Sequence, residues 1–266
     1  MRSCFAFVTL LLLLTQAGPA AAQAKLERLY TIDCGERTAP DVAPWTPGVN
    51  VGKPIDFSEN CYLLKHGTDW MVWDTGLPDA IFAAPSPDPH AWKRTRTLAG
   101  ELDKAGVKSA DIKYVAISHS HPDHIGNVEL FPQALLLVQK AEYDWPAQNG
   151  KPRFLPSHPV KTLDGDYDVF GDGSVMIIST PGHTPGHQSL LVKLPRTGAV
   201  LLSGDAVHLK DNWDAKRVPA INFDKEKSAT SMQHMVEVIA QNSAQLWINH
   251  DKPQSLTMRR PPEFYQ

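Results

Sequence analysis

Basic residues are not in excess in this chain of 266 residues. Lysine and arginine number 26 against 29 aspartate and glutamate residues, so the formal net charge is only −3. A protein that binds nucleic acid normally carries a basic face, and this balance argues against nucleic acid as a partner. Hydrophobic residues make up 42% of the chain, which is ordinary for a globular protein with a sizeable core.

Long apolar runs are also missing, except near the N-terminus. Phe5–Leu14 is apolar, Arg2 supplies a positive charge before it, and alanines at 20–22 offer a cleavage site. The run is shorter than the ~20 residues of a membrane-spanning helix. We therefore expect a signal peptide over residues 1–22 and a mature chain over 23–266, periplasmic or secreted, with no membrane contact after cleavage. An uncleaved anchor or a disordered tail is the alternative.

Cysteine is scarce, with three residues in the whole chain. Cys4 lies in the predicted signal peptide, which leaves Cys34 and Cys61 in the mature protein. An oxidising compartment permits a disulfide between them. Two buried free thiols are the alternative, and neither cysteine has a partner at metal-ligand spacing.

Strand-like and helix-like patterns alternate through both halves of the chain, and no linker-like stretch divides them. Strands are expected at Leu29–Asp33, Cys61–Lys65, Trp70–Trp73, Lys113–Ser118, Leu135–Val138, Ser174–Ser179, Ser189–Leu194, Ala199–Ser203 and Leu246–Ile248. Helices are expected at Arg94–Ala105, near Glu142 and at Ser228–Ile239, and long loops at Glu36–Asn60 and Pro78–Trp92. This order favours one α/β domain built from two packed sheets.

The segment His119-Ser120-His121-Pro122-Asp123-His124 places three imidazoles and a carboxylate within six residues. It directly follows a predicted buried strand, so its side chains can converge on one point. Imidazole and carboxylate are ligands of zinc and similar metals. The cluster therefore predicts a metal site, and four ligands so close together suggest more than one ion.

Three further polar residues follow predicted strands in the same way. They are His183, Asp205 and His250. A single histidine or a Gly-Asp pair is usually structural, but loops at strand ends of a rigid scaffold are where functional sites usually lie. Together with the six-residue segment, these residues make a metal site the best interpretation.

These motifs resemble those of the metallo-β-lactamase superfamily. The resemblance rests on the His-x-His-x-Asp-His pattern, on Thr180-Pro181-Gly182-His183, on Ser203-Gly204-Asp205, on the late His250 and on Trp73-Asp74-Thr75-Gly76. It covers nearly the whole mature chain. It implies an α/β fold of the αββα sandwich type, in which two mixed sheets are flanked by helices and the metals lie at one edge.

The resemblance also implies a division of the ligands between two divalent ions. One ion would be held by His119, His121 and His183, the other by Asp123, His124 and His250, with Asp205 and a hydroxide bridging both. Zinc is the expected metal, and iron, cobalt or manganese also suit these ligands. Asp74 would orient the ligand loop, His187 would be structural, and no role is expected for His66, His90, His158 and His234.

Within the superfamily, the chain is most similar to the N-acyl homoserine lactonase group. Leu29-Tyr30, Asp33-Cys34-Gly35, Leu163-Asp164-Gly165-Asp166 and Gly171-Asp172-Gly173-Ser174 resemble stretches of that group. The true β-lactamases lack a bridging carboxylate such as Asp205. The flavodiiron branch has Glu where this chain has His121, and the glyoxalase II branch has a longer region after the last histidine.

The resemblance predicts a secreted metal-dependent hydrolase that opens a lactone ring by attack of the bridging hydroxide. Asp123 or Asp205 would carry the proton. His208 stands where the best-known lactonases have a tyrosine, and its imidazole would donate to the carbonyl oxygen. A β-lactamase or a broad esterase of the same fold is the alternative, followed by a non-catalytic metal-binding protein. The sequence does not determine whether the protein is a monomer or a homodimer. It does not determine the acyl-chain preference either.

Two long loops contain apolar side chains that bear on specificity. They are Thr38–Phe57, with Trp45, and Ala206–Phe223, with Trp213. These side chains either form a wall for an acyl chain or cap the core beneath the loops, and the sequence favours neither.

Overall fold

The computed structural model describes residues 25–145, 154 and 156–266. The predicted signal peptide over residues 1–22 therefore lies outside the described residues. Among the described helices, none is both long and apolar enough to cross a membrane.

In the described part of the chain, two mixed β-sheets of six and five strands form the centre of the molecule. The first has six strands in chain order: β1 (Leu26–Ala39), β2 (Ile55–His66), β3 (Asp69–Trp73), β4 (Ile112–Ala116), β5 (Leu135–Gln139) and β6 (Val160–Leu163). The second has five, in the order β11 (Gln245–Trp247), β10 (Gly198–Leu202), β9 (Gln188–Leu194), β8 (Val175–Ser179) and β7 (Tyr167–Asp168). Each sheet combines parallel and antiparallel neighbours.

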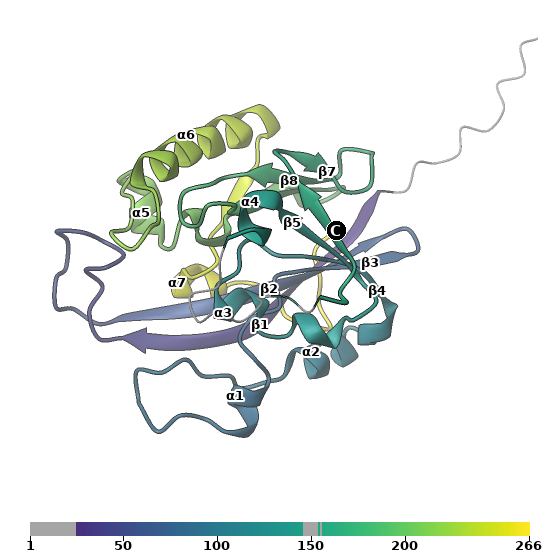
Figure 1. Ribbon diagram of the computed structural model, residues 1–266, viewed down its shortest axis with the longest axis horizontal. Coiled ribbons are helices and arrows are strands. Elements are labelled where there is room, and N and C mark those ends of the chain that lie inside the picture. The colour runs from purple at the N-terminus through teal and green to yellow at the C-terminus, as the bar shows by residue number, and fades with distance from the viewer. Residues whose placement is uncertain (1–24, 146–153, 155) are drawn as a thin grey trace, which may run out of the picture.

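Helices cover the outer face of each sheet (Figure 1). The described helices are α1 (Ala80–Ala83), α2 (Leu98–Lys104), α3 (Pro122–Ile125), α4 (Lys140–Tyr143), α5 (Lys210–Asp214), α6 (Lys225–Asn242) and α7 (Lys252–Ser255), with 3₁₀ turns at Ser109–Asp111, Val128–Leu130 and Gly204–Ala206. In Figure 1, α6 lies along one side of the molecule and α2 along the other, with the strands between them. This is the αββα order expected from the sequence, and the fold prediction is confirmed.

Three of the four buried apolar clusters of the described residues separate these four layers. One contains Tyr62, Leu64, Leu190 and Val200 and joins the two sheets. The second packs Leu98 of α2 on the first sheet. The third packs Met232 and Met235 of α6 on the second sheet, so these methionines are core residues. Burial on both sides of each sheet explains why the strands contain near-continuous apolar runs.

One expected loop is partly wrong. The segment Glu36–Asn60 was predicted as a loop, but β1 continues to Ala39 and β2 begins at Ile55. The two strands pair throughout, from Leu26 opposite His66 to Ala39 opposite Ile55. Polar residues such as Glu36, Arg37 and Asp56 concealed the strands, because backbone pairing in an antiparallel ladder does not require apolar side chains.

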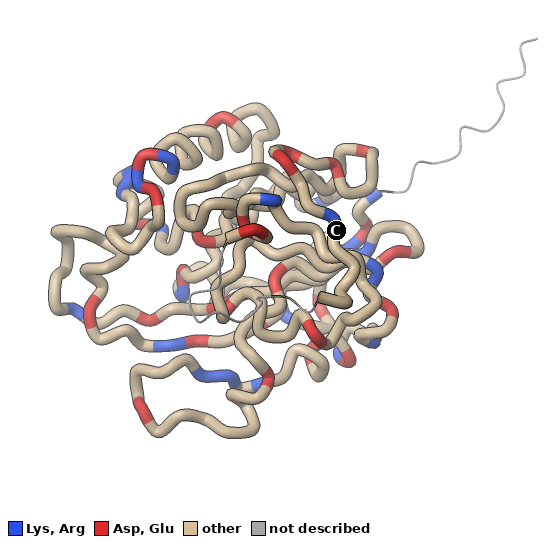
Figure 2. Tube along the Cα trace, in the orientation of Figure 1, with Lys and Arg blue, Asp and Glu red and all other residues tan. Residues whose placement is uncertain are grey.

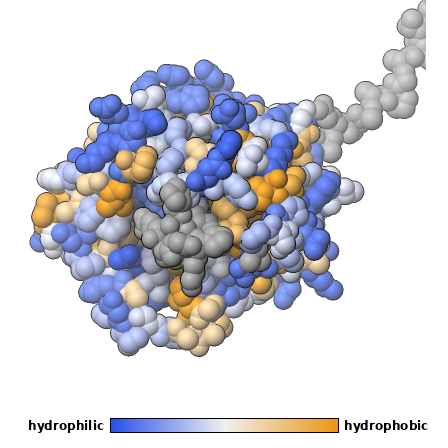
Figure 3. Space-filling view, viewed as in Figure 1, coloured by the Kyte–Doolittle hydropathy of each residue, from blue (hydrophilic) through white to orange (hydrophobic). Residues whose placement is uncertain are grey.

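Charged and apolar side chains are both mixed over the surface. Lys and Arg are interspersed with Asp and Glu along the chain in Figure 2. On the face seen in Figure 3, apolar side chains form separate small patches among hydrophilic ones.

A disulfide joins Cys34 and Cys61, which the sequence had left open. Cys34 lies at the β-bulge of β1, between Asp33 and Gly35, and Cys61 lies on the adjacent strand β2. Gly76 packs on this bond with φ +67°, and a Cβ there would lie 2.4 Å from the Cβ of Cys34. Only glycine fits this position, which explains the glycine of the Trp73–Gly76 motif.

Removing this disulfide lowers the free energy of unfolding. The two cysteines are 27 residues apart. A loop of that size corresponds to about 3.5 kcal/mol of chain entropy in the unfolded state. We therefore expect the Cys34→Ala/Cys61→Ala variant to lose about that amount in urea denaturation. Dithiothreitol should destabilise the parent protein and leave the double variant unchanged; equal stability of both proteins under oxidising conditions would contradict the assignment.

Candidate metal centre

The strand directions bring the predicted site residues to one edge of the two sheets. β3 and β4 are parallel, so Asp74 and His119 follow their ends at the same edge. β10 and β11 are parallel as well, which places Asp205 beside His250. β8 runs in the same direction as β10, because both are antiparallel to β9. His183 therefore emerges at this edge too.

The first group of ligand atoms comes from three histidines. Nε2 of His119 and Nε2 of His183 lie 2.8 and 3.1 Å from Nδ1 of His121. Burial lowers the pKa of all three imidazoles, which keeps them neutral. Nδ1 of His183 donates to Oδ1 of Asn222 at 3.0 Å, so its Nε2 carries a lone pair. Three neutral ring nitrogens that face one point are better suited to binding a metal ion than to contacting one another.

The second group lies beside the first. It contains Asp123, His124 and His250, whose ligand atoms lie within 4.8 Å of one another and of a carboxylate oxygen of Glu59. Nδ1 of His124 faces Oδ2 of Asp74 at 3.0 Å, and Nδ1 of His250 faces the carbonyl of Ser58 at 2.7 Å. Both rings therefore donate a hydrogen bond through Nδ1 and direct the lone pair of Nε2 into the metal centre.

Asp205 connects the two groups through its two carboxylate oxygens. Its Oδ2 lies 3.3 Å from Nε2 of His183 and 3.7 Å from Nε2 of His119. Its Oδ1 lies 3.0 and 3.2 Å from Nε2 of His250 and His124. Nε2 of His124 and Oδ1 of Asp205 are buried without a hydrogen-bond partner among the residues that the structure describes. Buried polar atoms are rarely left unsatisfied, and two cations here would engage both.

Electrostatic coupling in the second group is strong. Burial opposes a charge on His250, but the Asp205 and Glu59 carboxylates outweigh it and raise the pKa of His250 to about 10. Burial likewise opposes a charge on His124, whose pKa the Glu59 and Asp205 carboxylates nevertheless raise well above its usual value. Burial also raises the pKa of Asp205, yet His250 and His124 hold it well below its usual range. The carboxylates of this group thus favour positive charge, which a metal ion supplies.

His208 lies in the same centre. Its Nε2 is 3.1 Å from Oδ2 of Asp205, its ring stacks on that of His250 with 5.4 Å between the ring centroids, and its Nδ1 is buried with no hydrogen-bond partner in the described part of the chain. It faces the same cavity as Asp205 and His121, which has a volume of about 170 Å³. The structure thus brings together all eight residues predicted from the sequence as ligands or catalytic groups: His119, His121, Asp123, His124, His183, Asp205, His208 and His250.

The remaining predicted positions lie around or away from the centre. Oδ1 of Asp74 accepts from the amide of Ser118 at 2.6 Å, so this carboxylate holds the ligand loop as well as His124. His187 is fully buried and accepts from the amide of Asp205 at 2.9 Å through Nε2. His66 stacks on Phe170 and pairs with Asp172, outside the centre.

Glu59 is a residue that the sequence reasoning missed. It is fully buried, burial raises its pKa to about 8, and its carboxylate lies 3.7 Å from Nδ1 of His124 and 3.4 Å from Nδ1 of His250. Its Oε1 accepts from the side-chain amide of Asn249 at 2.8 Å. Because it faces the Nδ1 rather than the Nε2 atoms, Glu59 lies behind these two imidazoles. The register of β2 could have revealed it, had the strand been recognised.

Glu142 was not singled out either. One of its oxygens accepts from the backbone and the hydroxyl of Ser120, and the other accepts from the backbone of Gly186. This buried carboxylate therefore fastens the loop of His119 and His121 to the loop of His183.

The two apolar loops serve both purposes that the sequence left open. Trp45, Phe57 and Ile221 line the cavity above the metal centre, whereas Trp213 packs against the α6 cluster. Phe223 and Val51 are 60% and 64% exposed. One part of the loops thus forms a cavity wall, and another part caps the core.

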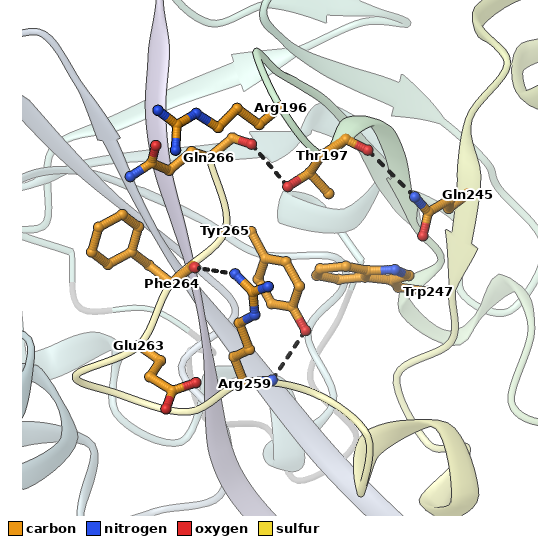
Figure 4. Close-up of a pocket in the computed structure, with 9 residues that line it drawn as sticks. All are labelled: Arg196, Thr197, Gln245, Trp247, Arg259, Glu263, Phe264, Tyr265 and Gln266. Atoms are coloured by element: carbon orange, nitrogen blue, oxygen red, sulfur yellow. Dashed lines mark hydrogen bonds between the residues drawn. The ribbon is translucent and has the colours of Figure 1, made fainter.

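A larger cavity lies between the C-terminal segment and β11. It has a volume of about 710 Å³ and is lined by Trp247, Arg259 and Tyr265 among others. In Figure 4 its polar groups bond to one another, including Arg259 to the carbonyl of Phe264 and Thr197 to that of Gln266. No histidine is among its described lining residues. Size alone therefore does not identify the functional site, whereas the ligand chemistry does.

Comparisons of the sequence agree with this geometry. The sequence model described as Metallo-beta-lactamase superfamily matches residues 54–238. The N-acyl homoserine lactonase AttM of Rhizobium radiobacter is 33% identical over 241 residues, which cover 82% of this chain and 89% of that protein. An N-acyl homoserine lactonase of a Bacillus species is 31% identical over 253 residues, covering 90% of this chain and 99% of that protein.

Solved structures agree as well. A quorum-quenching N-acyl homoserine lactone hydrolase superposes with a TM-score of 0.81 at 29% identity, over 90% of this chain and 98% of that chain. Another N-acyl homoserine lactone hydrolase, with the product N-hexanoyl-L-homoserine at its catalytic metal centre, gives 0.78 at 28% identity, over 90% and 99% of the two chains. The fold and the predicted family resemblance are both confirmed by these relatives.

Proposed function

Because the chain belongs to the metallo-beta-lactamase superfamily, we propose that it is a dinuclear metal-dependent lactonase that opens N-acyl homoserine lactones. The single observation that carries the proposal is the Asp205 carboxylate, whose two oxygens face two separate sets of imidazole nitrogens. The lactonases among its relatives support the substrate class.

The ligands divide between two sites. We assign His119, His121 and His183 to one ion, Asp123, His124 and His250 to the other, and Asp205 to both. Zinc is the metal we propose, because imidazole and carboxylate ligands suit it, and iron, cobalt and manganese remain alternatives for metal analysis. When bound, the two ions would supply Lewis acidity and lower the pKa of water, so that hydroxide forms near neutral pH.

The side chains of the centre direct the reaction. Hydroxide would add to the lactone carbonyl carbon, the ring C–O bond would break, and the hydrogen of the added hydroxyl would pass as a proton to the leaving alkoxide, which gives the carboxylate and the hydroxyl group of an open-chain hydroxy acid. Both Asp123 and Asp205 face the cavity, and we assign Asp123 to carry that proton because His250 and His124 hold the pKa of Asp205 well below its usual range. His208 donates a hydrogen bond to the oxygen on which negative charge develops, in the place of the tyrosine of better-known lactonases.

Replacing His208 with phenylalanine tests its role as a donor. A donor that acts on the developing oxyanion is worth roughly 10²- to 10³-fold in kcat. We expect His208→Phe to lower kcat by about 10²-fold with little change in KM, and His208→Tyr to restore most of the rate. His234→Phe, on α6 away from the centre, is the control. A His208→Phe enzyme with the parent kcat would rule out the assigned donation.

The substrate class is tested by parallel assays on metal-loaded protein. N-hexanoyl-L-homoserine lactone, nitrocefin and a p-nitrophenyl ester are offered at equal concentrations. We expect rapid ring opening of the lactone and slow turnover of the other two. Rapid nitrocefin hydrolysis without lactone opening would favour a β-lactamase, and the absence of any turnover would favour a metal-binding protein.

We further propose that residues 1–22 are a signal peptide and that the single domain over 23–266 acts in the periplasm or outside the cell. The disulfide between Cys34 and Cys61 supports this, because disulfides persist in oxidising compartments. N-terminal sequencing of the protein recovered from the periplasm or medium should begin at or near residue 23.

A further inference from the structure

Arg37 is a cationic side chain in the wall of the cavity above the metal centre. It lies on β1, opposite Phe57 of β2. Directly paired residues of two antiparallel strands lie on the same face of the sheet. Phe57 is 2% exposed, and its ring lies 5.8 Å from that of His250. The register of the two strands therefore directs the Arg37 side chain toward the metal centre.

Two indole rings hold the guanidinium in place. Its central carbon lies 5.9 Å from the ring centroid of Trp45 and 5.5 Å from that of Trp92. Trp45 packs on Phe57 at 4.7 Å, and Trp92 lies 5.7 Å from the ring of His250. Contact with aromatic faces stabilises the cation but leaves its N–H donors unused.

The donors of Arg37 have no acceptor among the described residues. The side chain makes no ion pair or hydrogen bond with the described parts of the chain, and its Nε is buried without a partner. Two other arginines, the buried Arg94 and the half-buried Arg260, also have one buried nitrogen each without a hydrogen-bond partner among the described residues, but both donate to other groups. Arg94 donates to the carbonyls of Leu77 and Arg96 and pairs with Asp79, and Arg260 donates to Asn60 and Ser255.

An arginine that faces a cavity with unused donors is suited to an oxygen acceptor on a ligand. Guanidinium presents planar N–H donors that match carbonyl and carboxylate oxygens. The scissile carbonyl belongs over the proposed metal ligands, and Arg37 lines the same cavity with Trp45 and Trp92 without belonging to a ligand group. We therefore assign its donors to a second oxygen of the substrate, outside the ring that is opened.

We propose that Arg37 is a specificity-determining residue that donates to the acyl-amide carbonyl oxygen of the substrate. This inference rests on the proposed lactonase function and adds a requirement to it. The enzyme prefers lactones with an acylamino group at the α-carbon over lactones that carry only an alkyl chain there. Trp45, Trp92 and Ile221 accompany the amide as the apolar part of the same subsite.

Two substrates that differ only at the amide test the proposal. They are N-hexanoyl-L-homoserine lactone and an α-alkyl-γ-butyrolactone of equal chain length. Arg37→Met keeps the apolar stem between the indoles and removes the donors. We expect it to lower kcat/KM for the acylamino lactone about 10- to 100-fold, mainly through KM, and that for the alkyl lactone less than about 3-fold. Arg37→Lys should restore part of the difference.

Lys53→Met is the matched control, because it removes one exposed cation from the adjoining loop. It should leave both rates unchanged. A fall of equal size for both lactones in Arg37→Met, or no fall for either, overturns the proposal. Melting temperatures of all variants show whether a loss of activity is a loss of folding.

A binding measurement separates this proposal from the proposed function. The lactam analogue of N-hexanoyl-L-homoserine lactone retains the amide carbonyl and resists hydrolysis. In calorimetric titrations, Arg37→Met should bind it at least about 10-fold more weakly than the parent protein does. Equal affinities, or no binding by the parent, overturn the role of Arg37 whether or not the lactones are hydrolysed. If neither lactone is opened but the lactam binds through Arg37, only the lactonase assignment fails.

Discussion

Replacing Asp205 with asparagine is expected to lower kcat/KM for lactone opening by at least about 10³-fold, equivalent to about 4 kcal/mol of transition-state stabilisation. The substitution preserves the volume of the side chain and removes its charge. In the parent protein, Oδ2 faces His183 at 3.3 Å and Oδ1 faces His250 at 3.0 Å. A neutral amide presents only one acceptor oxygen, so it cannot serve both groups of nitrogens.

Metal content distinguishes this explanation from simple misfolding. Asp205→Asn should bind at most one ion per chain, measured by elemental analysis after dialysis, and should keep the circular dichroism of the parent. Asp211→Asn, an exposed acid on α5, is the control and should keep both ions and full activity. An Asp205→Asn protein that holds two ions and retains its activity would refute the bridging role.

Removing the metal is expected to destabilise the protein more strongly at alkaline pH than at acidic pH. Glu59 has its pKa raised from 4.5 to about 8, so its contribution to the stability of the metal-free fold falls as pH rises through that range. The pKa of His250 is raised from 6.5 to about 10 by Asp205 and Glu59 against the effect of burial, and its contribution is lost as pH rises from 6.5 to 10. Both Glu59 and His250 therefore lower the stability of the metal-free fold as the pH rises.

Ions bound at the proposed centre would replace the protons of this group, and metal binding should therefore tighten with pH. At a free metal concentration 1,000 times the dissociation constant, each ion adds about 4 kcal/mol, or at least about 8 °C in melting temperature. Scanning calorimetry of metal-loaded and chelator-treated protein should show a gap that widens from pH 6 to pH 9. Glu59→Gln should flatten the metal-free profile between pH 4.5 and 8. A metal-free protein that becomes more stable from pH 6 to 9 would contradict the account.

The sequence predicted a metal centre because the residues that we propose as its ligands follow a local rule. The proposed ligands lie in the segments that follow β4, β8, β10 and β11, with Asp123 and His124 in the short helix α3 after β4, and parallel strands such as β3 and β4 end at the same edge of a sheet. The histidines and the aspartate of the segment 119–124 could be recognised because they lie within six residues. His183, Asp205 and His250 were recognised because each follows a predicted strand. Their convergence in the structure depends on strand direction, which apolar runs and turns largely determine.

Residues that act through strand register could not be predicted. Glu59 and Arg37 lie in the segment Glu36–Asn60, which was interpreted as a loop because of its prolines, glycines and charges. Both are strand residues whose direction follows from pairing, Arg37 opposite Phe57 and Glu59 opposite Gly35. Because the strands in this segment were not recognised, neither the buried Glu59 nor the half-buried Arg37 was predicted as a site residue.

Contacts between distant loops were equally hidden. Asn222 orients His183, although 39 residues separate them, and Glu142 fastens Ser120 to Gly186. No spacing rule connects such partners, because they depend on how loops from different strands pack together. The disulfide is an intermediate case: its two cysteines were evident, but their pairing depended on the bulge at Cys34.

The most direct test of the dinuclear lactonase is a titration of metal-free protein with zinc, followed by lactone opening at each step. Two groups of ligands joined by Asp205 predict that activity toward N-hexanoyl-L-homoserine lactone rises until two ions are bound per chain, and that elemental analysis gives the same number. Full activity at one ion per chain, or two bound ions without lactone opening, would contradict the account.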